Sequence, residues 1–488
     1  MQRWIVVCAG LICQAAASSA VFRIELGEGI TSVPVSGRVI VLIEPGATHR
    51  KLSLGPLPGN AIITAKEVRA LAPEAAVEID ADTPAYPISL AKLKDGEYSA
   101  MAILDPDHSF ARDRQDGGDL YSDTVVLRNG AATLVLKHVT PVKPQPPDTA
   151  TVKLVDFESP ALSKFWGRPI RMRAGVVLPA NAAAPLPAVF HIHGFGDNHT
   201  EAWREADRHA GSGFRAAHIY LDGSWTTGHH VFADSVNNGP WATALVTELI
   251  PHIEKRFRLA AQPRGRFLMG HSSGGWSAVW LQVNYPDFFG GAWPTSPDAL
   301  DFRSFSGVDF TPASKQNAYR DEKGAPRNLV RLDGRDVMSF EAYARMESVL
   351  GEYGGQIASF NWTFSPRGED GRPESAIDAA TGALNAGALR RWQRYDVAKI
   401  LRENWATLGP KLAGKIRLVV GEQDNFHLEK PAALFCELLA SKGMKNVCEF
   451  VPGRDHFTLL GPYSTYPDGL LKRIDDEMRA KWQGAQPR

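Results

Sequence analysis

The sequence predicts an α/β protein in which a mostly parallel sheet, flanked by helices, follows an all-β, sandwich-like domain. Short β-type runs fill residues 21–138, a Pro-rich segment at 139–150 ends that pattern, and strand-like and helical runs alternate through 151–480. Such alternation is typical of a parallel sheet covered by helices. The length of 488 residues also favours two domains, because it exceeds one ordinary core.

The first predicted domain is built from runs rich in Val, Ile and Tyr, such as "RVIVLIE" and "DTVVLRNGAATLVL", divided by Gly, Pro and Asp. In "EYSAMAILD", Tyr98, Ala100, Ala102 and Leu104 alternate onto one face of a strand. Short strands at regular spacing predict a β-sandwich. The segment "TPVKPQPPD" then forms a stiff linker.

The N-terminus predicts export. Residues 1–20 contain a basic residue, an apolar run ending near Cys13 and small residues up to Ala20, which is the pattern of a cleavable signal peptide. The run is too short to span a bilayer, and neither Cys8 nor Cys13 follows the small residue that lipid attachment needs. We therefore expect a secreted or periplasmic protein without a membrane anchor.

Charge balance limits the partners. Lys and Arg total 54, as do Asp and Glu, and no basic stripe stands out. The sequence gives no electrostatic reason to expect nucleic acid or an anionic membrane as a partner, and a small or neutral substrate fits better. The oligomeric state stays open.

The stretch "RFLMGHSSGGW" predicts the catalytic nucleophile of the second domain. Gly270-His271-Ser272-Ser273-Gly274 fits G-x-S-x-G between a strand-like run and a helical one. On such a sharp turn a serine hydroxyl projects toward substrate. Ser272 is therefore the predicted nucleophile; an ordinary turn with two capping hydroxyls is the alternative.

A histidine and an acid should follow the serine in the chain. His456, in "VPGRDHFT", is the predicted base, and Asp424, at the end of "IRLVVGEQD", is the predicted acid, with Glu422 in reserve. His427 leaves no room for an acid before it and is interpreted as a site-lining or surface residue. Asp455 is expected to point elsewhere or to cap its turn.

An oxyanion hole is expected from two backbone N–H groups. One is that of Ser273, directly after the nucleophile. The other comes from the loop "HGFGDN", where Gly194 permits close approach and the N–H of Phe195 is preferred to that of Gly196.

With these elements in place, residues of about 165–465 resemble the esterase D-like branch of the α/β-hydrolases, which includes feruloyl, acetyl-xylan and enterochelin esterases and mycolyltransferases. The resemblance rests on "HGFGDN", "GHSSGGW", "YPDFFGGAWPTSPD", "VVGEQDNF" and "PGRDHF". It implies a serine esterase with the triad Ser272, Asp424 and His456 and the oxyanion donors Phe195 and Ser273. An insertion at about 301–410 and the first domain depart from the common core.

The expected activity is hydrolysis of a carboxylic ester through an acyl-enzyme, on a carbohydrate-linked or aryl ester, without a cofactor. Three alternatives stay open. One is an acyltransferase of the same fold, and another is a polysaccharide-binding protein without activity. The third is a metal hydrolase, because His191-x-His193 on a strand would place two ligands on one face.

Two further patterns have two interpretations each. Cys436 and Cys448 form a disulfide or stay as two buried thiols. The tryptophans of the second domain line a sugar- or aryl-binding wall or pack helices on the sheet, namely Trp203, Trp225, Trp241 and Trp276.

Overall fold

The computed structural model describes residues 21–55, 59–127, 131–180, 185–211, 213–445 and 447–484. The predicted export signal lies outside the described residues. The described chain divides into two compact units, the first ending at Thr140 and the second holding everything from Pro141 onward. Residues 107–116 lie inside the predicted first domain but belong to the second unit, since the short helix α1 (Phe110–Asp113) packs on a helix of that unit.

Nine strands form one sheet in the described part of the first unit. Their order is β4-β1-β9-β7-β6-β2-β3-β5, with β8 paired to β6. The strands are β1 (Val21–Leu26), β2 (Val35–Pro45), β3 (Ile62–Leu71), β4 (Ala76–Ile79), β5 (Ala85–Tyr86), β6 (Tyr98–Asp105), β7 (Leu120–Ser122), β8 (Val125–Leu127) and β9 (Ala131–Val139).

This sheet curls around a single core. β3 and β4 lie near opposite ends of the strand order, which in a flat sheet would separate them by about 29 Å, yet the short turn between them can span only about 17 Å. The Lys66 ammonium of β3 donates to the Glu78 carbonyl of β4 at 3.2 Å. Alternate residues of both halves share one buried cluster, among them Phe22, Val41 and Ala102.

Eight strands form the main sheet of the described second unit, in the order β10-β11-β13-β12-β18-β19-β22-β23. β10, β11 and β13 pair antiparallel, and the strands from β13 to β23 are parallel. The mostly parallel sheet agrees with the prediction. The strands are β10 (Val152–Glu158), β11 (Arg171–Val177), β12 (Ala188–Ile192), β13 (Ala217–Leu221), β18 (Arg266–His271), β19 (Gly291–Thr295), β22 (Leu418–Gly421) and β23 (Cys448–Val451).

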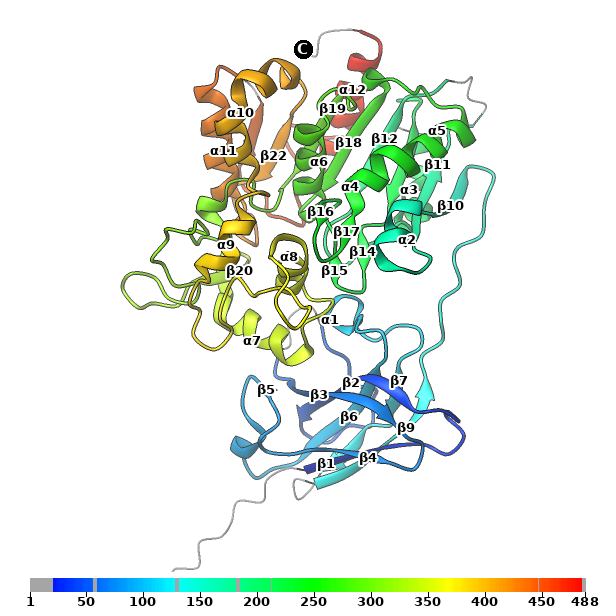
Figure 1. Ribbon diagram of the computed structural model, residues 1–488, viewed down its shortest axis with the longest axis vertical. Coiled ribbons are helices and arrows are strands. Elements are labelled where there is room, and N and C mark those ends of the chain that lie inside the picture. Colours follow the sequence, from blue (N-terminus) through cyan, green and yellow to red (C-terminus); the bar gives the residue numbers. More distant parts are fainter. Residues whose placement is uncertain are drawn as a thin grey trace, which may run out of the picture. The chain divides into compact units, whose positions relative to one another are not determined.

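Helices flank this sheet (Figure 1). The apolar face of α12 packs on Val189, Met269 and Val419, and α3 covers β11 and β13 beside it. α6 packs on β12, β18 and β19. The helices and the short ribbons between them are α2 (Pro160–Trp166), α3 (Glu201–Ala210), β14 (Ser224–Trp225), β15 (Gly228–His229), β16 (Asp234–Ser235), β17 (Gly239–Pro240), α4 (Trp241–Ala244), α5 (Ile250–Phe257), α6 (Ser273–Asn284), α10 (Val397–Leu412), α11 (Glu429–Ser441) and α12 (Leu470–Trp482).

The predicted insertion is a separate group of elements between β19 and β22, drawn in yellow-green and yellow in Figure 1. Its predicted end near residue 410 falls inside α10, which packs on α6 and so belongs to the helical layer of the sheet. The elements of the insertion are β20 (Asn328–Leu332), β21 (Arg335–Ser339), α7 (Phe340–Leu350), α8 (Gln356–Phe364) and α9 (Ala386–Trp392).

A disulfide joins Cys436 of α11 to Cys448 of β23, so the two cysteines pair instead of staying as thiols. This bond fixes the last strand of the sheet to its neighbouring helix, directly before the loop that holds His456. No helix among the described residues has the length and apolarity to cross a membrane.

Candidate active site

The turn between β18 and α6 holds Ser272 in an unusual backbone conformation. Ser272 has φ 57° and ψ −124°, where a residue with a side chain is strained, as expected of a nucleophile on a sharp strand-to-helix turn. A Cβ on Gly270 would lie 2.1 Å from the Gly274 carbonyl oxygen, and one on Gly274 would lie 1.9 Å from that of Ile192. Both glycines of the predicted motif are therefore required by close packing.

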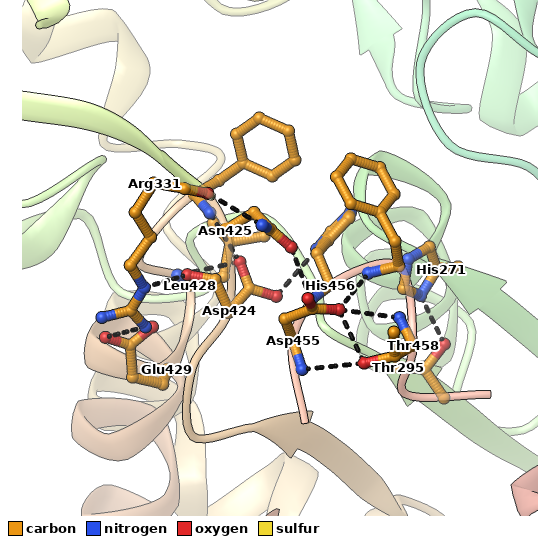
Figure 2. Close-up of polar contacts among 12 residues, drawn as sticks. His271, Thr295, Arg331, Asp424, Asn425, Leu428, Glu429, Asp455, His456 and Thr458 are labelled. Carbon is orange, nitrogen blue, oxygen red and sulfur yellow. Dashed lines mark hydrogen bonds and ion pairs between the residues drawn. The ribbon is translucent and has the colours of Figure 1, made fainter. Parts of the chain in front are cut away.

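Asp424 and His456 meet in loops that follow two neighbouring parallel strands, β22 and β23. The Asp424 Oδ2 atom lies 2.7 Å from the His456 Nδ1 atom, and both residues are buried (Figure 2). Burial disfavours the ionised carboxyl, but the hydrogen bond and the charge of His456 outweigh it and lower the pKa of Asp424. The Asp424 carboxylate is therefore placed to orient the His456 imidazole through its Nδ1 atom.

Two residues that sequence reasoning missed hold this pair in place. The Asn425 side chain accepts a hydrogen bond from the His456 backbone N–H at 3.0 Å and donates to the Arg331 carbonyl at 2.8 Å. Arg331, on β20 of the insertion, donates from Nε to the Asp424 carbonyl at 2.8 Å (Figure 2). The insertion thus holds the loop that carries Asp424 in place. In the sequence, the position of Asn425 next to Asp424 was the one available sign of these contacts.

The other acids and the other histidine considered for the site do not take part in the contact between Asp424 and His456. Glu422 is exposed, and the carboxylate that contacts His456 is that of Asp424. Asp455 accepts hydrogen bonds from the backbone N–H groups of Phe457 and Thr458 and caps its turn, as predicted. His427 lies 3.8 Å from Asp336 and 3.9 Å from Glu429, and burial lowers its pKa.

The loop after β12 passes directly beside Ser272. A Cβ on Gly194 would lie 3.3 Å from the Ser272 Cβ, which places Phe195, the next residue, close to the nucleophile. Ser273 is the first residue of α6 and is buried, so its N–H belongs to a helix N-terminus, where backbone donors favour negative charge. The oxyanion roles of Phe195 and Ser273 stay a prediction.

Ser272 also lies near His456, because the side chain of His271, the residue before Ser272, contacts the His456 ring. The ring centroids of His271 and His456 are 4.3 Å apart, and the His271 Nδ1 atom lies 3.0 Å from the Thr295 hydroxyl. Burial lowers the pKa of His271 to about 3, so this imidazole is neutral. No hydrogen bond joins the Ser272 hydroxyl to His456 among the described residues, and such contacts often tighten only when substrate binds.

A cavity with aromatic walls opens at Ser272. The walls come mainly from the insertion, with Phe426 and Leu428 contributed by the acid loop. The aromatic side chains that line the cavity are Phe305, Phe310, Phe340, Tyr343, Phe360, Trp392 and Phe426.

The four tryptophans considered for such a wall lie outside this cavity. Trp241 and Trp276 are buried, with Trp241 stacked on His230 and Trp276 on Trp280. Trp225 packs against Trp241. Trp203, on α3, packs against a buried cluster that includes Val177 and Tyr220. Trp225 and Trp241 border a second cavity instead. The wall beside Ser272 comes from residues that no pattern in the sequence singled out.

The pair of metal ligands in the metal-hydrolase alternative, His191 and His193, does not form. β12 ends at Ile192, and beyond it the His193 Nε2 atom accepts a hydrogen bond from the Gly223 N–H at 2.9 Å. His191 instead joins His209 and His218, with ligand atoms within 4.8 Å of one another.

The geometry of this histidine cluster, His191, His209 and His218, does not favour a cation. The rings of His209 and His218 stack with centroids 3.5 Å apart, which sets their nitrogens side by side instead of toward one point. The Arg208 guanidinium lies 3.3 Å from the His209 Nε2 atom and adds positive charge. Burial lowers the pKa of all three imidazoles, that of His218 to about 3.

Comparison with known proteins identifies the family of the chain. A family model described as "Putative esterase" matches residues 168–458, which is more than half of the chain. A search among curated proteins finds no match. Three similar solved structures are the fluorophosphonate-binding serine hydrolase F of Staphylococcus aureus, an S-formylglutathione hydrolase of Agrobacterium tumefaciens and a hyperthermophilic esterase of the archaeon Pyrobaculum calidifontis.

These three structures are distant from the chain. Their sequence identities are 16%, 15% and 13%, and their TM-scores are 0.39, 0.39 and 0.40. The alignments cover 67%, 69% and 68% of this chain and 98%, 97% and 84% of those chains.

The fold and the family match define a carboxylic ester hydrolase of the α/β-hydrolase class. The chain belongs to the esterase family whose model matches residues 168–458.

Proposed function

We propose that this chain is an exported serine esterase that forms an acyl-enzyme on Ser272. The observation that carries the proposal is the buried hydrogen bond between Asp424 and His456, in loops at the same sheet edge as the strained turn of Ser272. Parallel strands bring their carboxyl ends to one edge, which is where such loops can assemble a site. The disulfide supports export, since such bonds persist in oxidising compartments.

In the proposed mechanism His456 takes the proton of the Ser272 hydroxyl as the oxygen attacks the ester carbonyl. Asp424 fixes the imidazole tautomer and stabilises the imidazolium. The N–H groups of Ser273 and Phe195 hold the developing oxyanion. His456 then gives its proton to the leaving alcohol, and the same steps run with water to release the acid and free Ser272.

The cavity supports the substrate class. Its walls are aromatic and aliphatic, and its position at Ser272 allows it to hold an apolar part of the ester, such as an aryl group. Of the two substrate classes expected from the sequence, aryl esters therefore fit this cavity better than carbohydrate-linked ones.

The test is hydrolysis of acetyl, feruloyl and longer acyl esters by wild type and Ser272→Ala. We expect the variant to lose at least about 10³-fold in kcat/KM and to lose labelling by a fluorophosphonate, with unchanged thermal unfolding. Ser273→Ala keeps its backbone N–H and should still be labelled. Undiminished activity of Ser272→Ala would contradict the proposal, and products formed with an added alcohol would identify a transferase.

A further inference from the structure

Asp298 is a buried carboxylate beside the nucleophile that the proposed mechanism does not use. It lies in the loop after β19, is 6% exposed and lines the same cavity as Ser272. Its backbone N–H donates to the Ser272 carbonyl at 3.1 Å, and its Oδ2 atom accepts from the Ser273 hydroxyl at 2.6 Å. The carboxylate is therefore held within a few bonds' length of the reacting serine.

The surroundings of Asp298 leave its charge without a permanent cation. Asp298 and Tyr343 are the only ionisable side chains among the described residues that line the cavity, and no lysine or arginine of the described chain forms an ion pair with Asp298. Two charged groups act on the pKa of Asp298: His456 lowers it, and Asp424 raises it. Burial raises the pKa of Asp298 to about 6, so it is ionised at neutral pH.

An ionised carboxylate in an aromatic cavity is costly unless a cation or several donors accompany it. The hydrogen bond from the Ser273 hydroxyl supplies one donor, which a neutral amide at this position would accept equally well. The charge itself is therefore left for a ligand to balance. Aromatic rings around the carboxylate add to this preference, because their faces attract cations.

Given the proposed function, we propose that the substrate group that enters this cavity is apolar and carries an ammonium group, which Asp298 binds next to the scissile ester. An ester of an aromatic amino acid has this chemistry. The aromatic walls take the side chain, and Asp298 takes the ammonium close to the carbonyl that Ser272 attacks. Asp298 is then the residue that selects charged acyl groups over neutral ones.

The experiment compares three ethyl esters that differ in one group, those of phenylalanine, phenyllactate and 3-phenylpropanoate, which carry an ammonium, a hydroxyl and a hydrogen. At pH 7 we expect wild type to prefer the ammonium ester over the hydrogen one by about 10- to 100-fold in kcat/KM, the range of a hydrogen bond between charged groups. Asp298→Asn keeps the acceptor for Ser273 and should abolish the preference while still hydrolysing 3-phenylpropanoate. Glu422→Gln, which removes an exposed acid that does not line the cavity, should keep the wild-type ratio.

Other outcomes overturn the proposal. Equal rates for the ammonium and hydroxyl esters would show that Asp298 does not select charge. An equal loss on all three esters in Asp298→Asn would show that it acts through His456 instead of on the substrate.

A binding measurement separates this proposal from the proposed mechanism. Calorimetry of Ser272→Ala with 2-phenylethylammonium and with 2-phenylethanol needs no hydrolysis. We expect the ammonium to bind at least about 10-fold more tightly, and to lose that advantage in Ser272→Ala with Asp298→Asn. Equal binding of the two probes overturns the proposal even if the esterase mechanism holds, and tighter ammonium binding supports it even if no ester is cleaved.

Discussion

Two groups of buried histidines in the hydrolase unit differ in what their nitrogens contact. The His456 Nδ1 atom lies 2.7 Å from a carboxylate of Asp424, at the edge of the sheet where Ser272 lies. In the histidine cluster, under α3, the His191 Nε2 atom lies 2.9 Å from the His218 Nδ1 atom, and the partners beyond are Tyr220 and the cation Arg208.

This difference sets the charge that surrounds each imidazole. A carboxylate partner stabilises the imidazolium, whereas neighbouring imidazoles and a guanidinium repel a second positive charge. The histidine cluster is held neutral by burial and by these neighbours. The number of histidines in a cluster and their burial therefore do not identify a candidate catalytic base. The charge of the group that each imidazole contacts is the more informative property.

The largest expected effect comes from breaking the proposed catalytic pair, Asp424 and His456. Asp424→Asn keeps an oxygen for the Phe426 N–H but removes the charge that stabilises the imidazolium, so we expect kcat/KM to fall by about 10⁴-fold. The matched variant in the histidine cluster, His218→Gln, should stay within about twofold of wild type, since it contacts neither Ser272 nor His456. Steady-state kinetics on one aryl ester measures both.

Thermal unfolding is the control for this pair of variants. If His218→Gln lost activity while it stayed folded at the assay temperature, the histidine cluster would be coupled to catalysis and the contrast between the two regions would be wrong.

The sequence predicted the order of the functional parts better than their surroundings. Ser272, Asp424 and His456 could be placed because each follows a strand-like run, and the carboxyl ends of parallel strands share an edge. The position of Arg331 could not be predicted, since its contact with Asp424 spans 93 residues and depends on how the insertion folds back. The same holds for Phe305 and Trp392, whose shared cavity depends on packing within the insertion.

The histidine pattern shows a second limit. His191 and His193 alternate as on a strand, but the strand ends between them, so the second ring turns to Gly223. A shift of one residue in a strand end changes which side chains meet, and the sequence pattern does not fix strand ends that closely.

A second comparison concerns stability. Because burial raises the pKa of Asp298 to about 6 from 3.8, the unfolded chain ionises first, and Asp298 destabilises the fold as pH rises from about 4 to 6. The shift of about two pKa units sets an upper bound of about 3 kcal/mol on this cost at pH 8. Asp298→Asn should therefore raise the free energy of unfolding at pH 8, but much less at pH 4.5, in urea titrations at the two pH values. A gain of equal size at both would mean that the carboxylate charge is not the cause.

The smallest effect concerns the pH dependence of the histidine cluster. The pKa of His218 is lowered from 6.5 to about 3 in the folded state, so below pH 6.5 the unfolded chain binds a proton that the fold refuses. The free energy of unfolding is therefore not reduced by such a histidine above pH 6.5. Below that pH it falls by about 1.4 kcal/mol per pH unit for each histidine of this kind.

His218→Gln should reduce that slope by about one proton between pH 6 and pH 5, whatever the substitution does to stability at pH 8. The nearby Asp475, whose pKa burial raises to about 6, and Glu201, raised to about 7, titrate in the same range with the opposite sign. Arg208 stays charged throughout, and Tyr220 stays neutral, so neither adds to the slope. His218 also lowers the pKa of His191 and of His209, but burial is the larger cause for both, so we expect these two imidazoles to stay neutral in the variant. The difference in slope between wild type and His218→Gln therefore reports on His218, and an unchanged slope would show that its imidazole is protonated inside the fold.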